Sequence, residues 1–160
     1  MAISYSLDLA TPAPAPQVAR EVHDVARTSG LFDAAVTAEQ LLDGGAVTTL
    51  GTRVVVLESR PQPWNPVTTD LGFTPTVSVE FVLDKDNALP AQQDDIVRIV
   101  GGLLDLVSGD LVLHREFEDI WLLRRGGELS VGEQDDLWPA GRLALLHQPY
   151  RRTTQAFADE

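Results

Sequence analysis

Alternating apolar and polar side chains predict the strands of this chain. Alternation is most regular over residues 76–83, where positions 77, 79, 81 and 83 are apolar and positions 76, 78 and 80 are polar. Residues 3–9 follow the same rule. A run of valines predicts a strand within residues 46–59, in which Gly51 marks a turn or a bulge. Shorter strands are predicted at residues 111–115, 120–125 and 128–131, and Gly126-Gly127 predicts a two-residue hairpin loop between the last two.

Helical periodicity predicts two main helices. Residues 17–29 carry valines at i, i+4 and i+7, and Gly30 follows in the place typical of a C-terminal cap. A second helix begins near Pro90 and has an apolar stripe at positions 96, 100, 103 and 107. Gly101 and Gly102 interrupt it, and close packing of this helix on a sheet would explain why they are tolerated. A short helix is predicted after Pro139.

The remaining segments are connections. Residues 32–42 are compatible with a short strand or with a helical turn at 38–42, and residues 60–73 form a proline-rich loop. Two amphipathic helices over a mostly antiparallel sheet predict an α+β, two-layer sandwich with a short C-terminal helix. Because the strands alternate, one sheet face is expected to be wet or used for binding. We expect one domain over residues 1–150 and a frayed, polar C-terminal tail over residues 151–160.

Charge narrows the choice of partners. The 160-residue chain has a formal net charge of −12, no cysteine and three histidines. Such a field repels nucleic acids and anionic membranes and attracts basic proteins. The absence of cysteine excludes disulfides and thiolate zinc sites. The N-terminal residues resemble no signal peptide and no apolar run suits a membrane span, so we expect a cytoplasmic protein.

Motifs for catalysis and for cofactors are missing. The glycine doublets fit neither a P-loop nor a dinucleotide fingerprint, and no serine-nucleophile elbow is present. No catalytic, cofactor-binding or metal-ligating residue is therefore assigned. One alternative is a small metal-dependent hydrolase: if the strand continues, His114, Glu116 and Glu118 share one face. The competing interpretation is a solvated strand end that enters a turn.

Two features suggest contacts with a protein. Trp64 lies in the proline-rich loop, where it either folds back over the core or forms an exposed anchor of the kind enriched in interfaces. Glu133, Asp135 and Asp136 form an acidic cluster. Trp64 and these three acids are the predicted partner-binding residues. A self-associating scaffold that uses an exposed sheet face or edge is a further alternative.

Three stretches carry a resemblance to a known family. They are residues 1–11, the run Gly72-Phe73-Thr74-Pro75-Thr76 that continues to Lys85, and residues 122–129 followed by 138–146. In this order they resemble the SitI family of bacterial immunity proteins. The resemblance implies an antidote, because named members neutralise a partner SitA lipoprotein toxin that sibling cells exchange by contact. It implies no catalytic residues and favours a protein partner, here a basic toxin.

Overall fold

A computed structural model describes residues 3–158; Met1, Ala2 and the last two residues of the predicted tail lie outside it. The described residues form one eight-stranded sheet in the order β2-β3-β4-β1-β5-β6-β7-β8. All neighbours are antiparallel except β7 and β8, which confirms the mostly antiparallel sheet. The strands are β1 (Ile3–Ala10), β2 (Ala46–Val47), β3 (Arg53–Glu58), β4 (Val77–Leu83), β5 (Asp110–Arg115), β6 (Asp119–Arg125), β7 (Glu128–Val131) and β8 (Arg151–Arg152).

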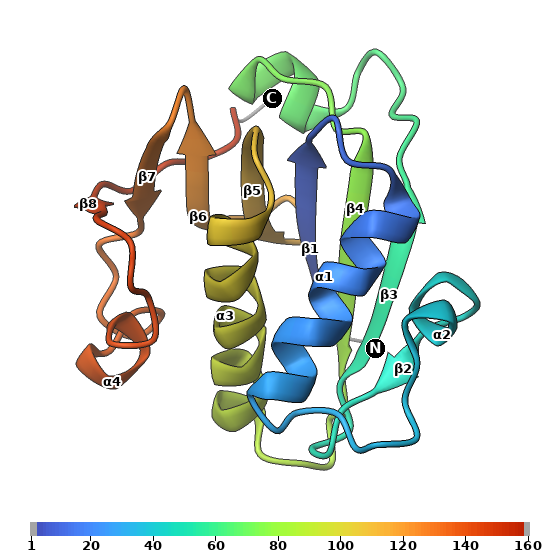
Figure 1. Cartoon of the computed structure of the whole chain (residues 1–160). Helices are drawn as coiled ribbons and strands as arrows, with labels where there is room; N and C mark the ends of the chain where they lie inside the picture. Colours follow the sequence, from blue (N-terminus) through green and yellow to red (C-terminus); the bar gives the residue numbers. More distant parts are fainter. Residues whose placement is uncertain (1–2, 159–160) are drawn as a thin grey trace.

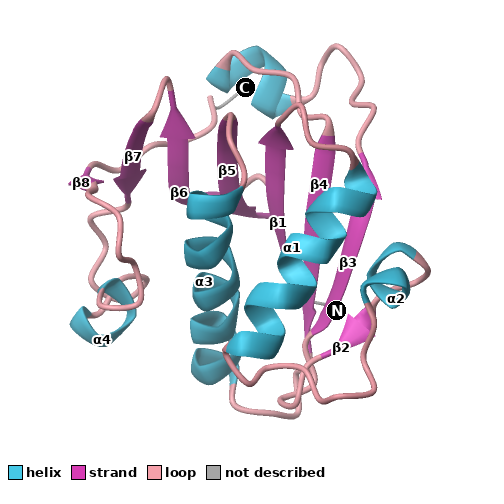
Figure 2. Ribbon diagram, viewed as in Figure 1, coloured by secondary structure: helices cyan, strands magenta, loops and turns pink. Residues whose placement is uncertain are grey.

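Two long helices cover one face of this sheet. Figure 1 shows α1 (Ala15–Thr28) and α3 (Leu89–Leu106) side by side in front of the central strands. The short helices α2 (Ala38–Leu42) and α4 (Ala140–Leu143) lie at opposite edges (Figure 2). A single turn of π-helix, η1 (Val67–Leu71), lies within the proline-rich loop. The fold is α+β, as the patterns predict, and the ambiguous residues 38–42 are helical.

The main core lies between the sheet and the two long helices. Tyr5, Leu7 and Leu9 of β1 face this layer and are almost fully buried. The sequence suggested that the glycines of α3 allow this helix to pack closely on the sheet, but Gly102 faces α1. A Cβ atom at Gly102 would lie 2.5 Å from Cγ1 of Val25, so this glycine allows α1 and α3 to approach each other and not the sheet.

The opposite face of the sheet is only partly covered. Val67, Leu71 and Phe73, from η1 and its flank, pack on β5 and β6 residues in a second, smaller apolar cluster. The C-terminal segment also reaches this face, because Phe157 packs on the cluster and the Ala158 N–H donates to Asp70. These contacts and the pairing of β8 with β7 differ from the frayed tail that the polar sequence predicts.

The predicted turns have a clear conformational basis. Gly126 and Gly127 have φ of 60° and 82°, the two positive values that a type I′ hairpin between β6 and β7 requires. Gly51 has φ of 97° and lies in the turn that separates β2 from β3, which settles its role as a turn residue. Thr37 and Gln40 form a reciprocal capping box that starts α2.

Arg124 of β6 terminates α3. Its guanidinium donates to the carbonyl oxygens of Leu104 (2.8 Å), Val107 (2.5 Å) and Gly109 (2.9 Å). These carbonyls have no helical partner of their own, and a cation also suits the negative end of the helix dipole. Burial lowers the pKa of Arg124, and this loss is partly offset by Asp110 and Asp105. One side chain thus joins the sheet to the main helix.

We predict that Arg124→Met lowers the free energy of unfolding by about 3 kcal/mol, because three carbonyl groups lose a charged donor. Arg125→Met is the matched control, since Arg125 makes a single 3.1 Å bond to the Leu71 carbonyl. Chemical denaturation of both variants measures the difference. Equal losses would show that Arg124 does not hold the helix end in the proposed way.

Candidate functional site

The uncovered part of the second sheet face forms a groove with a volume of about 330 Å³. Outward-facing residues of the three central strands provide most of its floor. We name it the acidic groove; it is lined by Ser4, Tyr5, Ser6, Asp8, Ser59, Asn65, Pro75, Ser78, Glu80, His114, Glu116 and Phe117. The sequence pattern predicts that one sheet face is wet or used for binding, and this groove is the open portion of that face.

A buried carboxylate, that of Asp8, organises the floor. Its Oδ1 accepts hydrogen bonds from Ser6 Oγ (2.9 Å) and Ser78 Oγ (2.7 Å), and its Oδ2 lies 2.7 Å from His114 Nε2. Burial by itself raises the pKa of Asp8. The hydrogen bond and electrostatic attraction of His114, together with the two serine hydroxyls, outweigh burial and hold the pKa below its ordinary value.

Both ring nitrogens of His114 are used inside the fold. The backbone N–H of Phe117 donates to Nδ1 over 3.1 Å, so Nδ1 presents a lone pair. It follows that Nε2 carries hydrogen and donates to Asp8. The His114 side chain is 2% exposed. A general base or a metal ligand needs a free lone pair that faces a substrate or an ion, and this ring offers none.

A strained turn places an aromatic ring over His114. The Glu118 N–H donates to the Arg115 carbonyl, and the two residues between them, Glu116 and Phe117, have φ of 52° and 61°. Bulky residues rarely adopt these values, so the turn stores conformational energy. The Phe117 ring stacks on His114 at a centroid distance of 4.5 Å, and Phe157 meets both rings edge-on.

The turn at residues 115–118 bears on the alternative of a metal site at His114, Glu116 and Glu118. The strand ends at Arg115, so His114, Glu116 and Glu118 do not share a face. The imidazole is buried against Asp8 on the second sheet face, whereas the two glutamates are exposed on the turn. Among residues 3–158, no group of three His, Cys, Asp or Glu side chains is placed to hold a metal ion. The shared face that the metal-dependent alternative required of these three residues is therefore not formed.

The predicted partner-binding residues are all exposed, but they do not form one patch. Trp64 is 73% exposed and does not cover the core. It precedes Asn65, which lines the acidic groove. Glu133, Asp135 and Asp136 follow β7, near the opposite edge of the sheet from the loop after β3 (Figure 1). Glu133 also accepts a hydrogen bond from the Thr154 N–H over 3.0 Å.

The groove carries charge of one sign. Asp8, Glu80 and Glu116 are the charged residues among those that line it. Arg115 lies next to Glu116 in the chain, but its guanidinium lies 3.4 Å from Glu118 and 3.1 Å from Asp119. Glu80 and Glu116 are exposed and their carboxylates make no hydrogen bond within the described fold. The groove therefore attracts cations and repels phosphates and carboxylates.

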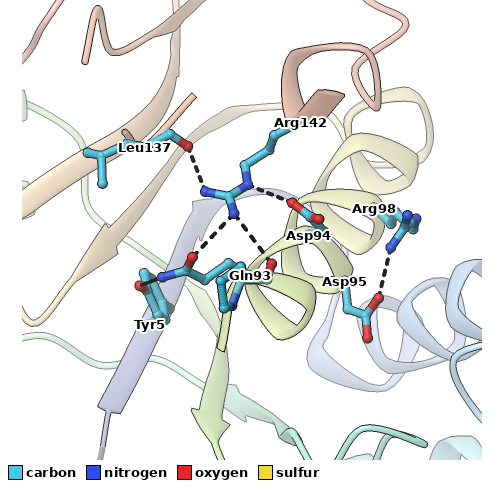
Figure 3. Close-up of polar contacts among 8 residues, drawn as sticks. Tyr5, Gln93, Asp94, Asp95, Arg98, Leu137 and Arg142 are labelled. Atoms are coloured by element: carbon cyan, nitrogen blue, oxygen red, sulfur yellow. Dashed lines mark hydrogen bonds and ion pairs between the residues drawn. The ribbon is translucent and has the colours of Figure 1, made fainter. Parts of the chain in front are cut away.

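A second polar cluster, centred on Arg142, joins the C-terminal region to α3 (Figure 3). The buried guanidinium donates to Asp94 Oδ1 (2.7 Å), to the Leu137 carbonyl (2.7 Å) and to Gln93 Oε1 (3.2 Å). Gln93 in turn donates to the Tyr5 hydroxyl over 3.0 Å. The Arg142 guanidinium also lies over the Trp121 ring. Because the Arg142 guanidinium is buried and bonded to groups of the protein itself, this cluster stabilises the fold and is not a candidate binding site.

Comparison with protein families identifies a family to which the chain is similar. A family model described as SitI3-like matches residues 3–142. No curated protein and no solved structure matches the chain. In residues 3–158, no helix has the length and apolar character that crossing a membrane requires.

We predict that Asp8→Asn lowers the free energy of unfolding at neutral pH by about 2 kcal/mol, because a charged acceptor for three donors is lost. The depressed pKa sets the pH dependence. The contribution of Asp8 is complete above the ordinary carboxyl pKa of 3.8 and is lost as pH falls through the lower native pKa. Denaturation at several pH values should therefore show the difference between the proteins shrinking only below that value. A difference that is constant down to strong acid would contradict it.

Proposed function

The chain belongs to the SitI3-like family, and from this membership we propose that it is an immunity-type protein that binds and neutralises a partner toxin. The carrying observation is the length of the match, since residues 3–142 include both long helices and seven of the eight strands in residues 3–158. An antidote of this kind acts in the cytoplasm by occupying its partner, and it needs a complementary surface in place of a catalytic centre.

The geometry supports binding over catalysis. The histidine that comes nearest to a catalytic arrangement, His114, is enclosed by Asp8 and the Phe117 amide. The serines nearest to it donate to Asp8 and not to the imidazole, so no serine is activated as a nucleophile by that ring. The carboxylates of Glu80 and Glu116 face solvent at the groove and are exposed. We therefore propose that the protein is not an enzyme.

Charge supports a basic partner. A net charge of −12 raises the rate at which a basic protein encounters this chain, and the rate falls as salt screens the field. Charge also disfavours nucleic acids and anionic membranes as partners. Exposed aromatic side chains then supply the short-range contact that holds a complex together. Trp64, with its exposed fraction of 73%, is the strongest candidate for that contact.

A neutralisation assay tests the proposal. Products of genes adjacent to the one that encodes this chain are expressed with and without it, and growth is followed. We predict that the chain restores growth arrested by one such product and binds it in calorimetry, more weakly at high salt than at low salt. Arrest that persists for every toxic product, with no heat of binding, would refute the proposal. Light scattering on the free chain separates this outcome from self-association.

Trp64 provides a test at single-residue resolution. We predict that Trp64→Ala weakens toxin binding by at least tenfold, in keeping with the share of binding energy that buried aromatic anchors carry. Stability should change little, because the side chain is exposed in the free protein. Leu106→Ala is the matched control, since Leu106 is an exposed apolar residue (49%) at the end of α3 on the helical side. Unchanged affinity in Trp64→Ala would remove Trp64 from the interface.

A further inference from the structure

We propose that the acidic groove is the docking site for a basic segment of the partner protein, and that an arginine or lysine side chain of that segment enters between residues 60–66 and the turn at 115–118. This inference rests on the proposed function and adds to it a location and a chemistry. It concerns a sheet face that the described fold leaves uncovered between two structured borders, the segments on either side of η1 (Asn65 and Pro75) and the Phe117 turn.

The borders show that the opening is a formed feature of the fold. On the η1 side, the Asn65 side chain accepts the Val67 N–H over 2.9 Å, which holds the loop at the groove rim. On the other side, Phe117 is stacked on a buried histidine. The floor hydroxyls of Ser6 and Ser78 are bonded to Asp8 and cannot move freely. An occupant therefore meets a surface that is already arranged, which lowers the entropy cost of binding.

The chemistry of the lining selects a cation. Asp8, Glu80 and Glu116 contribute negative charge, and Ser6 lies opposite Glu80 in the β1–β4 register. A phosphate or a carboxylate would be repelled. A divalent metal ion is disfavoured, because residues 3–158 contain no triad of ligand side chains close enough to hold one. A long organic cation such as a lysine or arginine side chain can pair with carboxylates that lie apart, whereas a metal ion needs several ligands close together.

The aromatic rim favours arginine among such cations. Phe117 is 41% exposed although it is stacked on His114, so part of its ring is open to the groove side, and Trp64 precedes the rim residue Asn65. A guanidinium stacks on aromatic rings and forms paired hydrogen bonds with a carboxylate at the same time. The volume of about 330 Å³ accommodates a long side chain and some water, but not a folded element.

The competing acidic surface is the cluster of Glu133, Asp135 and Asp136. It is exposed and has the same sign of charge, yet Glu133 is already bonded to Thr154 and the segment lies near the opposite edge of the sheet. Both surfaces would attract a basic partner from a distance. Only the acidic groove offers a recess with an aromatic border for a side chain of the partner. The two surfaces should therefore differ in affinity for a basic peptide, which can be measured.

The test compares two double variants of equal net charge. Glu80→Gln with Glu116→Gln removes two charges from the groove, and Asp135→Asn with Asp136→Asn removes two from the distant cluster. All four residues are exposed, so both proteins should fold. The probe is a fluorescein-labelled oligo-arginine peptide, followed by fluorescence anisotropy at low salt. We predict that the groove variant binds the peptide about fivefold more weakly than the cluster variant does.

Amide chemical shifts give an independent measure. In the unsubstituted chain, the peptide should shift resonances of β1, β4 and the turn at 115–118 more than those of residues 133–136. Equal weakening in the two variants, or shifts concentrated at residues 133–136, would overturn the inference. Substitution of the peptide arginines by citrulline, which removes their charge, should abolish the shifts.

The toxin itself separates this inference from the proposed function. If a toxin is neutralised equally well by the native chain and by the groove variant, the function stands and the groove assignment is wrong. If no toxin is neutralised but the peptide still discriminates between the variants, the antidote role is wrong and the groove stands as a site for basic peptides. Loss of neutralisation in the groove variant alone supports both.

Discussion

The carboxylate of Asp8 is almost fully removed from water and therefore needs hydrogen-bond donors from the protein. The second face of the sheet is arranged around this requirement. Its donors come from β1, from β4 and from β5, so one side chain connects the three central strands. Because an unpaired buried charge costs several kcal/mol, each donor is held where it is. The position of His114 follows from this, and the ring of Phe117 is placed by His114.

Local periodicity explains how much of the fold could be predicted. The regular alternation before Leu83 and the apolar stripe of α3 are confirmed, because each reports which side of an element faces the core. Gly126-Gly127 forms the predicted hairpin for a similar reason, since few residues other than glycine tolerate two positive φ angles in succession. These signals lie within a few residues of the structure that they specify.

The candidate site could not be predicted because its contacts are not local. Asp8 and His114 are 106 positions apart, and no spacing rule joins them. The end of β5 at Arg115 agrees with the strand predicted over residues 111–115. The positive φ angles of Glu116 and Phe117 could not be predicted, because neither residue is a glycine or an asparagine. Trp64 was identified from its loop alone; its exposure is established by the structure, whereas its role in binding is still a prediction.

The same hydrogen bonds that stabilise this face also limit its chemistry. A histidine beside a carboxylate and two serines contains the residue types of a hydrolase, but here the serines and the imidazole all donate to one acceptor. Satisfying Asp8 therefore uses the groups that catalysis would need to keep free. The carboxylates of Glu80 and Glu116 are left facing solvent beside an exposed aromatic ring. Such groups attract and orient a cationic partner, and for that reason the groove is better suited to recognition than to reaction.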